Sequence, residues 1–324
     1  MIFRKAAYPT LLIILSCCLY VSCKKDKLHF NKVITLQSNT GDRLNAIYVS
    51  GSTQYVVGGD RFTRATILVS SDSGNNWVVN NITEAGKGLY GVSANTHGNV
   101  YVCGFDAKLI WSNDDGKQWH FVQMSNWQPF KDIEFVGANK ALAISGVSYN
   151  SGGIGILDST GSILHWDSVA TEYNDIAMAD ANIGYIAGYG VVMKTSDGGN
   201  TWSYLDIKND NFTALSIINK NNVWTCGVGG SIWHTSDGGN TWQRKRNGNN
   251  LLKTKYHLHD ILFIDDNNGW CVGEGGLVMY TKDGGEHWSE YEKFTDNILR
   301  SIALLPDGRL LVCGDNGSLY KLER

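Results

Sequence analysis

The chain has 324 residues, of which 43% are hydrophobic and 18% are charged, and its formal net charge at pH 7 is −3. Such a chain is too apolar and too aromatic to be disordered, and too weakly charged for a general nucleic-acid-binding protein, so we expect no nucleic-acid partner. Its 37 glycines, 11 tryptophans and only 3 prolines are typical of many short strands joined by tight turns.

The first 22 residues have the pattern of a secretory signal peptide. Arg4 and Lys5 precede an apolar run over residues 11–15, which is short for a membrane-spanning helix. Residues 19–23 (LYVSC) follow this run and resemble a bacterial lipobox, with Tyr20 where leucine is usual. In proteins with a lipobox, the signal is removed and the cysteine, here Cys23, is lipidated.

The lipobox resemblance implies a signal peptide over residues 1–22, a lipidated Cys23 with a short tether over residues 23–27, and a folded body held at a membrane surface. It places the protein in the bacterial cell envelope, as a membrane-anchored lipoprotein on the periplasmic or the outer-membrane face. A plain secretory signal or an uncleaved anchor is the alternative interpretation.

The body of the chain, residues 28–324, is an internal repeat. The pattern Ser/Thr-x-Asp-x-Gly-x-x-Trp, which we call the Asp motif, occurs in five clean copies and in one degenerate copy at residues 157–161 with Trp166 displaced. Successive aspartates are 39 to 46 residues apart, a period that suits the four short strands of a β-propeller blade. The clean copies contain Asp72 and Trp77, Asp114 and Trp119, Asp197 and Trp202, Asp237 and Trp242, and Asp283 and Trp288.

Each repeat also contains two further strand-like segments. The first is apolar and occurs seven times, at residues 44–49, 89–92, 130–136, 173–178, 212–218, 258–264 and 299–305. The second ends each time in a glycine: Gly58, Gly104, Gly146, Gly188, Gly227, Gly273 and Gly314. A third strand leads into the Asp motif and a fourth follows it. We therefore predict an all-β fold, a single seven-bladed β-propeller domain with four antiparallel strands per blade.

The last repeat ends without a fourth strand. A strand-like segment over residues 28–36 precedes the first blade, and we expect it to join the last blade as the missing outer strand. Such closure hides strand edges that otherwise aggregate. A solenoid that does not close is the alternative architecture.

The Asp motif falls between two strands and therefore predicts a hairpin turn. Its aspartate can accept hydrogen bonds from N–H groups of the turn, its glycine supplies a positive φ, and its tryptophan buries a large ring. We therefore assign these aspartates and tryptophans a structural role, and not the role of catalytic acids or metal ligands.

The Asp motif resembles the Asp-box (BNR) repeat. Whole repeats such as residues 184–199 and 269–285 resemble the photosystem II stability/assembly factor-like propellers of chloroplasts, cyanobacteria and many non-photosynthetic bacteria, and the resemblance covers about residues 28–324. The photosynthetic members hold a membrane-protein partner, so the resemblance implies a propeller fold and a non-enzymatic, partner-binding role. Nothing in the sequence indicates photosynthesis itself.

Ligands of propellers usually meet a mouth formed by the loops before the first strands and the loops between the second and third strands. Alignment of the first strands places a polar ring there: Asn45, Tyr90, Lys131, Asn174, Thr213, His259 and Arg300. The other loops add Asp60, Arg61, Arg64, Asp106, Lys108, Tyr149, Tyr189, Glu274 and Asp315. Our candidate binding residues are Arg43, Asn45, Arg61, Arg64, Tyr90, Lys131, Asn174, His259, Glu274 and Arg300.

Closure of the ring makes the last and first blades neighbours, so we expect Arg43, Arg61, Arg64 and Arg300 to cluster. Such a group on an acidic protein suits a carboxylate, a phosphate or an acidic segment of a partner. Solvated loop charges are the alternative interpretation.

The sequence has no motif for a metal or another cofactor, and we expect none. Four cysteines of the body lie in separate repeats and lack the spacing of a zinc site. We expect them to be small buried hydrophobic residues: Cys103, Cys226, Cys271 and Cys313.

These observations leave three functional hypotheses. The favoured one is a monomeric scaffold that binds a protein partner without catalysis. The second is a glycan-binding lipoprotein that stacks sugars on Tyr90 or Trp127. The third is a sialidase-like glycoside hydrolase, which needs an arginine triad and two carboxyl groups across a cleft. Its candidates are Arg43, Arg61 and Arg300 for the triad, and Asp132, Asp175, Asp260 and Glu274 for the carboxyl groups.

Overall fold

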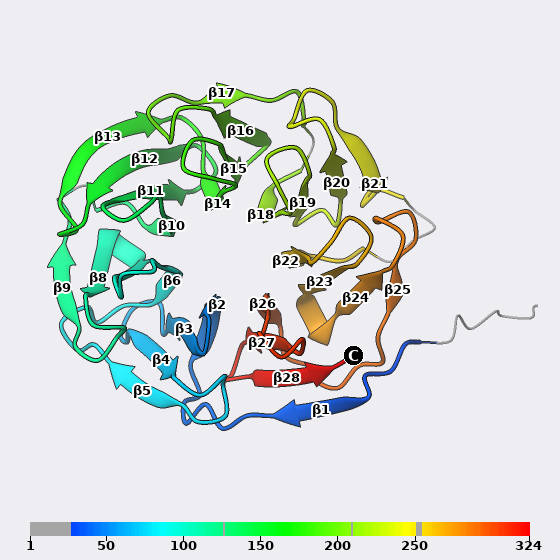
Figure 1. Cartoon of the computed structure of the whole chain (residues 1–324), viewed down its shortest axis with the longest axis horizontal. Helices are drawn as coiled ribbons and strands as arrows, with labels where there is room; N and C mark the ends of the chain where they lie inside the picture. The colour runs from blue at the N-terminus through cyan, green and yellow to red at the C-terminus, as the bar shows by residue number, and fades with distance from the viewer. Residues whose placement is uncertain (1–26, 126, 209, 251–254) are drawn as a thin grey trace, which may run out of the picture.

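Each predicted repeat forms one four-stranded antiparallel sheet, and the seven sheets stand around a central channel as the blades of a propeller (Figure 1). The computed structural model describes residues 27–125, 127–208, 210–250 and 255–324 of the chain. The predicted signal peptide, Cys23 and all but the last residue of the tether lie outside these ranges. The predicted all-β, seven-bladed fold is confirmed.

The strands of blades 1 to 6 follow chain order from the channel to the rim. Blade 1 contains β2 (Arg43–Ser50), β3 (Thr53–Gly59), β4 (Thr66–Ser70) and β5 (Val78–Asn81). Blade 2 contains β6 (Leu89–Ala94), β7 (Val100–Gly104), β8 (Lys108–Ser112) and β9 (His120–Gln123). Blade 3 contains β10 (Phe130–Phe135), β11 (Lys140–Val147), β12 (Ser151–Asp158) and β13 (Ile163–Val169).

The remaining blades repeat this arrangement. Blade 4 contains β14 (Tyr173–Met178), β15 (Gly184–Gly188), β16 (Val191–Thr195) and β17 (Ser203–Tyr204). Blade 5 contains β18 (Phe212–Ile217), β19 (Val223–Gly227), β20 (Ile232–Thr235) and β21 (Gln243–Arg246). Blade 6 contains β22 (Leu258–Phe263), β23 (Gly269–Gly273), β24 (Val278–Thr281) and β25 (Ser289–Glu290). Blade 7 contains β26 (Leu299–Leu304), β27 (Leu310–Gly314), β28 (Leu319–Glu323) and β1 (Lys32–Thr35).

Short 3-10 turns stand in two of the loops between second and third strands, η1 (Phe105–Ala107) and η2 (Glu274–Gly276). Within the described ranges, the protein has no helix whose length and hydropathy would let it span a membrane.

The start of the described chain closes the ring, as predicted. Strand β1 pairs with β28, with Val33 opposite Leu322, and completes blade 7. Just before β1, the N–H of Leu28 donates to the carbonyl oxygen of Glu290 at 2.9 Å, and the ring of Phe30 stacks on Tyr291 at 3.7 Å. The first described segment therefore fastens blade 6 as well as blade 7, which excludes an open solenoid.

Apolar side chains from neighbouring blades make up the core between them. At the seam of blades 7 and 1, Leu44 and Val56 pack with Leu311 and Cys313, and all four are fully buried. Cys103, Cys226 and Cys271 are likewise buried and free, as predicted. Close packing also explains a glycine at the end of a second strand. A Cβ on Gly314 would lie 2.0 Å from the carbonyl oxygen of Ile298, so only glycine fits there.

The Asp motifs form the predicted hairpin turns on the face opposite the mouth, because they join third and fourth strands. In every clean copy the aspartate accepts a hydrogen bond of 2.7–2.9 Å from the hydroxyl two residues before it. It also accepts one of 2.9 Å from the backbone N–H four residues after it. These bonds favour the ionised carboxylate, and the pKa of Asp237 is lowered to about 2, chiefly by the N–H of Thr241.

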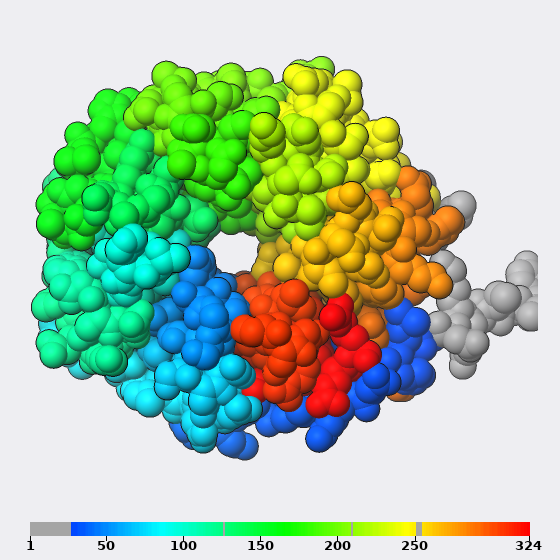
Figure 2. All heavy atoms as spheres, viewed as in Figure 1, coloured from blue at the N-terminus to red at the C-terminus, as the bar shows by residue number. Residues whose placement is uncertain are grey.

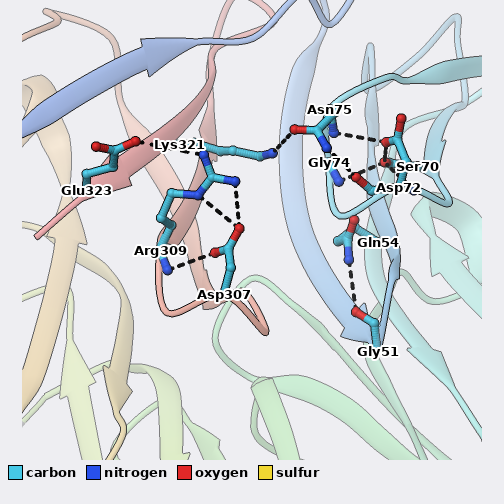
Figure 3. A network of polar contacts seen from close by, with 10 residues as sticks. All are labelled: Gly51, Gln54, Ser70, Asp72, Gly74, Asn75, Asp307, Arg309, Lys321 and Glu323. Carbon is cyan, nitrogen blue, oxygen red and sulfur yellow. Dashed lines mark hydrogen bonds and ion pairs between the residues drawn. The ribbon is translucent and has the colours of Figure 1, made fainter.

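A buried lysine uses one of these turns to fasten the closing seam (Figure 3). Lys321 of β28 is only 1% exposed, and its Nζ donates to Oδ1 of Asn75 in the Asp motif of blade 1 at 2.8 Å. Lys140 and Lys194 also donate into Asp motifs, to the carbonyl oxygens of Gly198 and Gly238 in the next blades. The Asp motif turns therefore join blades, besides closing hairpins.

Candidate functional site

The seven first strands line the central channel, and each contains a β-bulge. The residue that the bulge skips is each time the member of the predicted polar ring. In blade 1, Leu44 pairs with Gly58 and Ala46 with Val57, so that Asn45 has no partner on β3. A bulge re-aims the side chain of the extra residue. All seven ring residues line one cavity of about 460 Å³ in the channel, whose opening is visible at the centre of Figure 2.

Three ring residues form hydrogen bonds to the neighbouring blade with their polar side chains. Nδ2 of Asn45 donates to the carbonyl oxygen of Leu89 at 2.7 Å, and Nδ2 of Asn174 donates to that of Phe212 at 2.8 Å. Oγ1 of Thr213 donates to the carbonyl oxygen of Leu258 at 3.0 Å. These side chains join consecutive first strands, which leaves fewer of their polar atoms for a ligand.

The carboxyl groups next to the bulges also join blades. Oδ2 of Asp132, Asp175 and Asp260 accepts the backbone N–H of Ile176, Leu215 and Ile302 at 3.2, 2.5 and 2.9 Å, each time on the next blade. Burial raises the pKa of Asp132 and of Asp260 to about 7. Burial and the neighbouring Asp132 together raise the pKa of Asp175 well above its usual range. These acids, which are the candidates for glycoside hydrolysis, therefore hold the inner ring together.

A second cavity of about 420 Å³ opens on the mouth between blades 1, 2 and 7, and we call it the arginine pocket. The structure brings three of the four predicted arginines together in its wall, with Tyr90 beside them: Arg43, Arg61 and Arg64. The fourth, Arg300, lines the channel instead. Its Nε is 2.5 Å from Oδ1 of Asp315, and the same oxygen is 3.3 Å from Nε of Arg43. The expected cluster is thus formed, with Arg300 attached through a shared carboxylate.

The arginines of the pocket differ in how their charge is compensated. Arg64 pairs at 2.6 Å with Asp42, whose side chain is 3% exposed. Arg43 and Arg300 share Asp315. Arg61 has no carboxylate partner among the described residues, and its guanidinium lies 5.2 and 4.8 Å from the ring centres of Phe62 and Phe105. Arg61 is therefore the uncompensated cation of the pocket, held in place by aromatic rings.

The other candidate residues lie apart from the arginine pocket. Lys131 pairs at 2.8 Å with the buried carboxylate of Glu172 on the mouth between blades 3 and 4. His259 lines the channel, and burial lowers its pKa to about 4, so its ring is neutral at pH 7. Glu274 lines neither cavity and pairs with His257 at 2.8 Å.

Sequence reasoning missed the residues that hold these charges in place. Asp42 and Glu172 stand just before first strands, and nothing in the repeat pattern marks them as buried. The two phenylalanines under Arg61 lie in loops between second and third strands, where the sequence-based candidates are charged residues and tyrosines. Within the described ranges, no group of three or more His, Cys, Asp or Glu side chains is placed to hold a metal ion.

Two stretches of the chain, residues 161–251 and 247–304, match the family described as "Photosynthesis system II assembly factor YCF48". No curated protein sequence matches the chain.

The whole fold is similar to solved propellers. YCF48 from Cyanidioschyzon merolae aligns with a TM-score of 0.71 at 18% identity, over 90% of this chain and 98% of that chain. A structure titled "YCF48 bound to D1 peptide" aligns with a TM-score of 0.71 at 15% identity, over 92% and 96%. The WD40 repeats of RRP9 also align with a TM-score of 0.71, at 10% identity over 92% and 98%. At these identities the similarity shows the fold.

Proposed function

The chain resembles the photosystem II assembly factor family of YCF48, and from this premise we propose that it is a non-enzymatic propeller that holds a protein partner at its mouth. One of the similar structures is YCF48 bound to a D1 peptide, which supports a polypeptide as the ligand. The partner of this chain would be another protein of the bacterial envelope, since the sequence has a lipobox-like segment and no photosynthetic feature.

The observation that carries the proposal is the arginine pocket. Three guanidinium groups converge in one cavity beside Tyr90, and Arg61 has no carboxylate partner in the described chain. A guanidinium binds a carboxylate through two parallel hydrogen bonds, which fixes direction as well as position. The pocket is therefore suited to an acidic side chain or a terminal carboxylate of the partner.

Lipidation of Cys23 would keep this scaffold close to the bilayer. Cys23 is four residues before Lys27, which lies at the edge of blade 6 with its Nζ 3.9 Å from Glu290. Four residues span at most about 14 Å even when fully extended. The rim of blade 6 would thus stay near the membrane surface, and the partner would be a membrane protein or a protein next to one.

Catalysis is not part of the proposal. The channel acids that a glycoside hydrolase would need accept backbone N–H groups of the next blade, and Glu274 pairs with His257. We assign these carboxyl groups to stability.

The test substitutes Arg61, because its loss leaves no buried acid without an ion-pair partner. Loss of Arg64, by contrast, would leave the buried Asp42 unpaired. The tagged full chain, its Arg61→Glu variant and the control Arg244→Glu, on the exposed outer strand β21, are used to capture proteins from envelope extracts of the source bacterium. We expect the parent and the control to retain one saturable partner and Arg61→Glu to lose it. Failure of the parent to retain any saturable partner would contradict the proposed function.

A further inference from the structure

We infer that the mouth carries a second contact surface, an aromatic platform formed by Tyr149 and Tyr189, which receives a large apolar side chain of the same partner segment whose acidic group enters the arginine pocket. The inference rests on the proposed function and specifies the chemistry of the partner: a linear peptide segment with an acidic group and an apolar anchor some residues away.

The distribution of exposed aromatic residues points to this face. Among the described residues, four large hydrophobic side chains that are about half or more exposed lie in loops, and each of these loops belongs to the mouth: Phe62, Trp127, Tyr149 and Tyr189, with 62, 61, 57 and 48% exposure. The other exposed large hydrophobic residues of the described chain lie on outermost strands: Val33, Val78, Leu164 and Tyr204. Exposed aromatic residues and arginines together are typical of protein interfaces.

The platform spans two blades. Tyr149 lies in the loop between β11 and β12 of blade 3, and Tyr189 in the loop between β15 and β16 of blade 4. Their ring centres are 4.8 Å apart and their planes differ by 37°. The two rings therefore pack against each other and form one aromatic surface that spans both blades, against which a large apolar side chain can lie.

Hydrogen bonds fix both loops to Glu172, at the start of blade 4. The N–H of Tyr149 donates to Oε2 of Glu172 at 2.9 Å, and the N–H of Glu172 donates to the carbonyl oxygen of Tyr149 at 3.3 Å. The N–H of Tyr189 donates to the carbonyl oxygen of Glu172 at 2.8 Å. The platform is therefore organised before a partner arrives, which lowers the entropy lost on binding.

The backbone of Tyr149 is strained. Its φ is +68° and that of Ser148 before it is +56°, in the left-handed region that bulky residues avoid. Such a conformation persists only where the surrounding structure holds it. This strained conformation exposes a large ring to water. The exposed ring contributes little to the stability of the fold, but it is accessible to a partner.

A line of contacts connects the platform with the arginine pocket. Tyr90 lines both the pocket and the channel, and Nζ of Lys131 lies 5.8 Å from its ring centre. Lys131 in turn pairs with Glu172, the residue that holds Tyr149. An extended segment that enters the pocket with its acid can therefore cross the mouth over Tyr90 and Lys131 and reach the platform. A polypeptide segment offers an acid and an apolar anchor at such separate points.

The test begins with random linear peptides displayed on phage and selected on the full chain in detergent. We expect the selected peptides to share an acidic residue or a free carboxyl end and, at a separate position, a large apolar residue. Affinities of synthetic copies are then measured by fluorescence anisotropy for the parent and its variants. Removal of a central aromatic anchor typically weakens binding about tenfold or more, and we expect this for Tyr189→Ala and for Tyr149→Ala/Tyr189→Ala.

The controls separate the two proposals. Tyr149→Phe/Tyr189→Phe keeps both rings and should bind like the parent, as should Tyr204→Ala, which removes a still more exposed tyrosine from the outer strand β17. At high salt the effect of Arg61→Glu should shrink through screening, while that of Tyr189→Ala should persist. Because the strained backbone belongs to Tyr149 and not to Tyr189, Tyr189→Ala tests the ring itself, and circular dichroism checks its fold.

The inference is overturned if the selected peptides bind Tyr189→Ala and the parent equally well while Arg61→Glu loses them, in which case the proposed function stands. It is also overturned if an array of glycans, rather than peptides, is retained in a Tyr149-dependent manner. If the parent selects no peptide and captures no partner, both proposals fail.

Discussion

The carboxyl groups in the channel make stability depend on pH in a direction opposite to that of ordinary surface acids. Asp132 ionises at about pH 4 in an unfolded chain, but burial raises its pKa in the ring to about 7. Between these values the folded protein holds a proton that the unfolded chain releases, so the free energy of unfolding falls as pH rises. For one such carboxyl group the loss from about pH 5 to pH 8 is roughly 2 to 3 kcal/mol.

The substitution Asp132→Asn removes this dependence with little change in shape. An amide oxygen can still accept the N–H of Ile176, and the amide carries no charge at any of these pH values. We expect the variant to match the parent near pH 5 and to be roughly 2 to 3 kcal/mol more stable near pH 8. Asp260, whose pKa burial also raises to about 7, keeps its own slope in both proteins. Asp175 does not: Asp132 raises its pKa, so the substitution lowers the pKa of Asp175 and flattens the pH dependence of the variant further.

Urea unfolding followed by tryptophan fluorescence, at several pH values from 5 to 8, measures the difference. Buried histidines with lowered pKa values, such as His259, contribute equally to both proteins and cancel in the comparison. Asp206→Asn is the matched control, because the Asp206 side chain is 92% exposed and should leave the pH dependence unchanged. Parallel pH profiles for the parent and Asp132→Asn would refute the assignment of a buried, protonated carboxyl group.

Three further expectations concern the fold. Gly314→Ala should lower the free energy of unfolding in urea by about 2–4 kcal/mol, because the new Cβ would collide with the carbonyl oxygen of Ile298. Gly41→Ala should have little effect, because Gly41 has open space around it. Equal effects of the two substitutions would contradict this reasoning. Cys103 and Cys271 should resist iodoacetamide in the native protein and react only in denaturant, because burial raises their pKa values; peptide mapping by mass spectrometry checks this, and rapid labelling of the native protein would contradict their burial. Asp237→Asn should lower the thermal midpoint at pH 7, and this effect should disappear as the pH falls toward 2. The reason is that the pKa of Asp237 is lowered, so that the side chain stabilises the turn only while it is ionised. A constant difference down to pH 2 would count against the turn's hydrogen bonds.

The repeat pattern predicted the fold in detail because each level of the sequence agrees with it. The Asp motif sets the third turn of a blade, a glycine ends the second strand, and an apolar segment marks the first. Even the segment over residues 28–36 was predictable as the closing strand, since the last repeat lacked one. The repeat pattern did not predict the β-bulges of the first strands, because one extra residue in a short apolar strand hardly changes its composition.

The site was predictable only as a set of positions. Register placed Asn45, Lys131 and Arg300 at the channel, but whether each group is free depends on contacts with the next blade. Asn45 is tied to Leu89, and Lys131 to Glu172. Such pairs join segments from different repeats, and they depend on the exact offset between neighbouring sheets, which no single repeat encodes.

The two faces of the ring divide stability and recognition between them. The Asp motifs and the lysines that reach into them join blades on one face, where Lys321 closes the seam through Asn75. Hydrophobic packing and the channel carboxyl groups join the blades inside. Because these contacts hold the ring, the loops of the other face can carry groups that are poorly compensated or strained, such as Arg61, which has no carboxylate partner among the described residues, and the exposed Tyr149. These residues of the mouth contribute little to the stability of the ring. We therefore expect a partner to bind on this face.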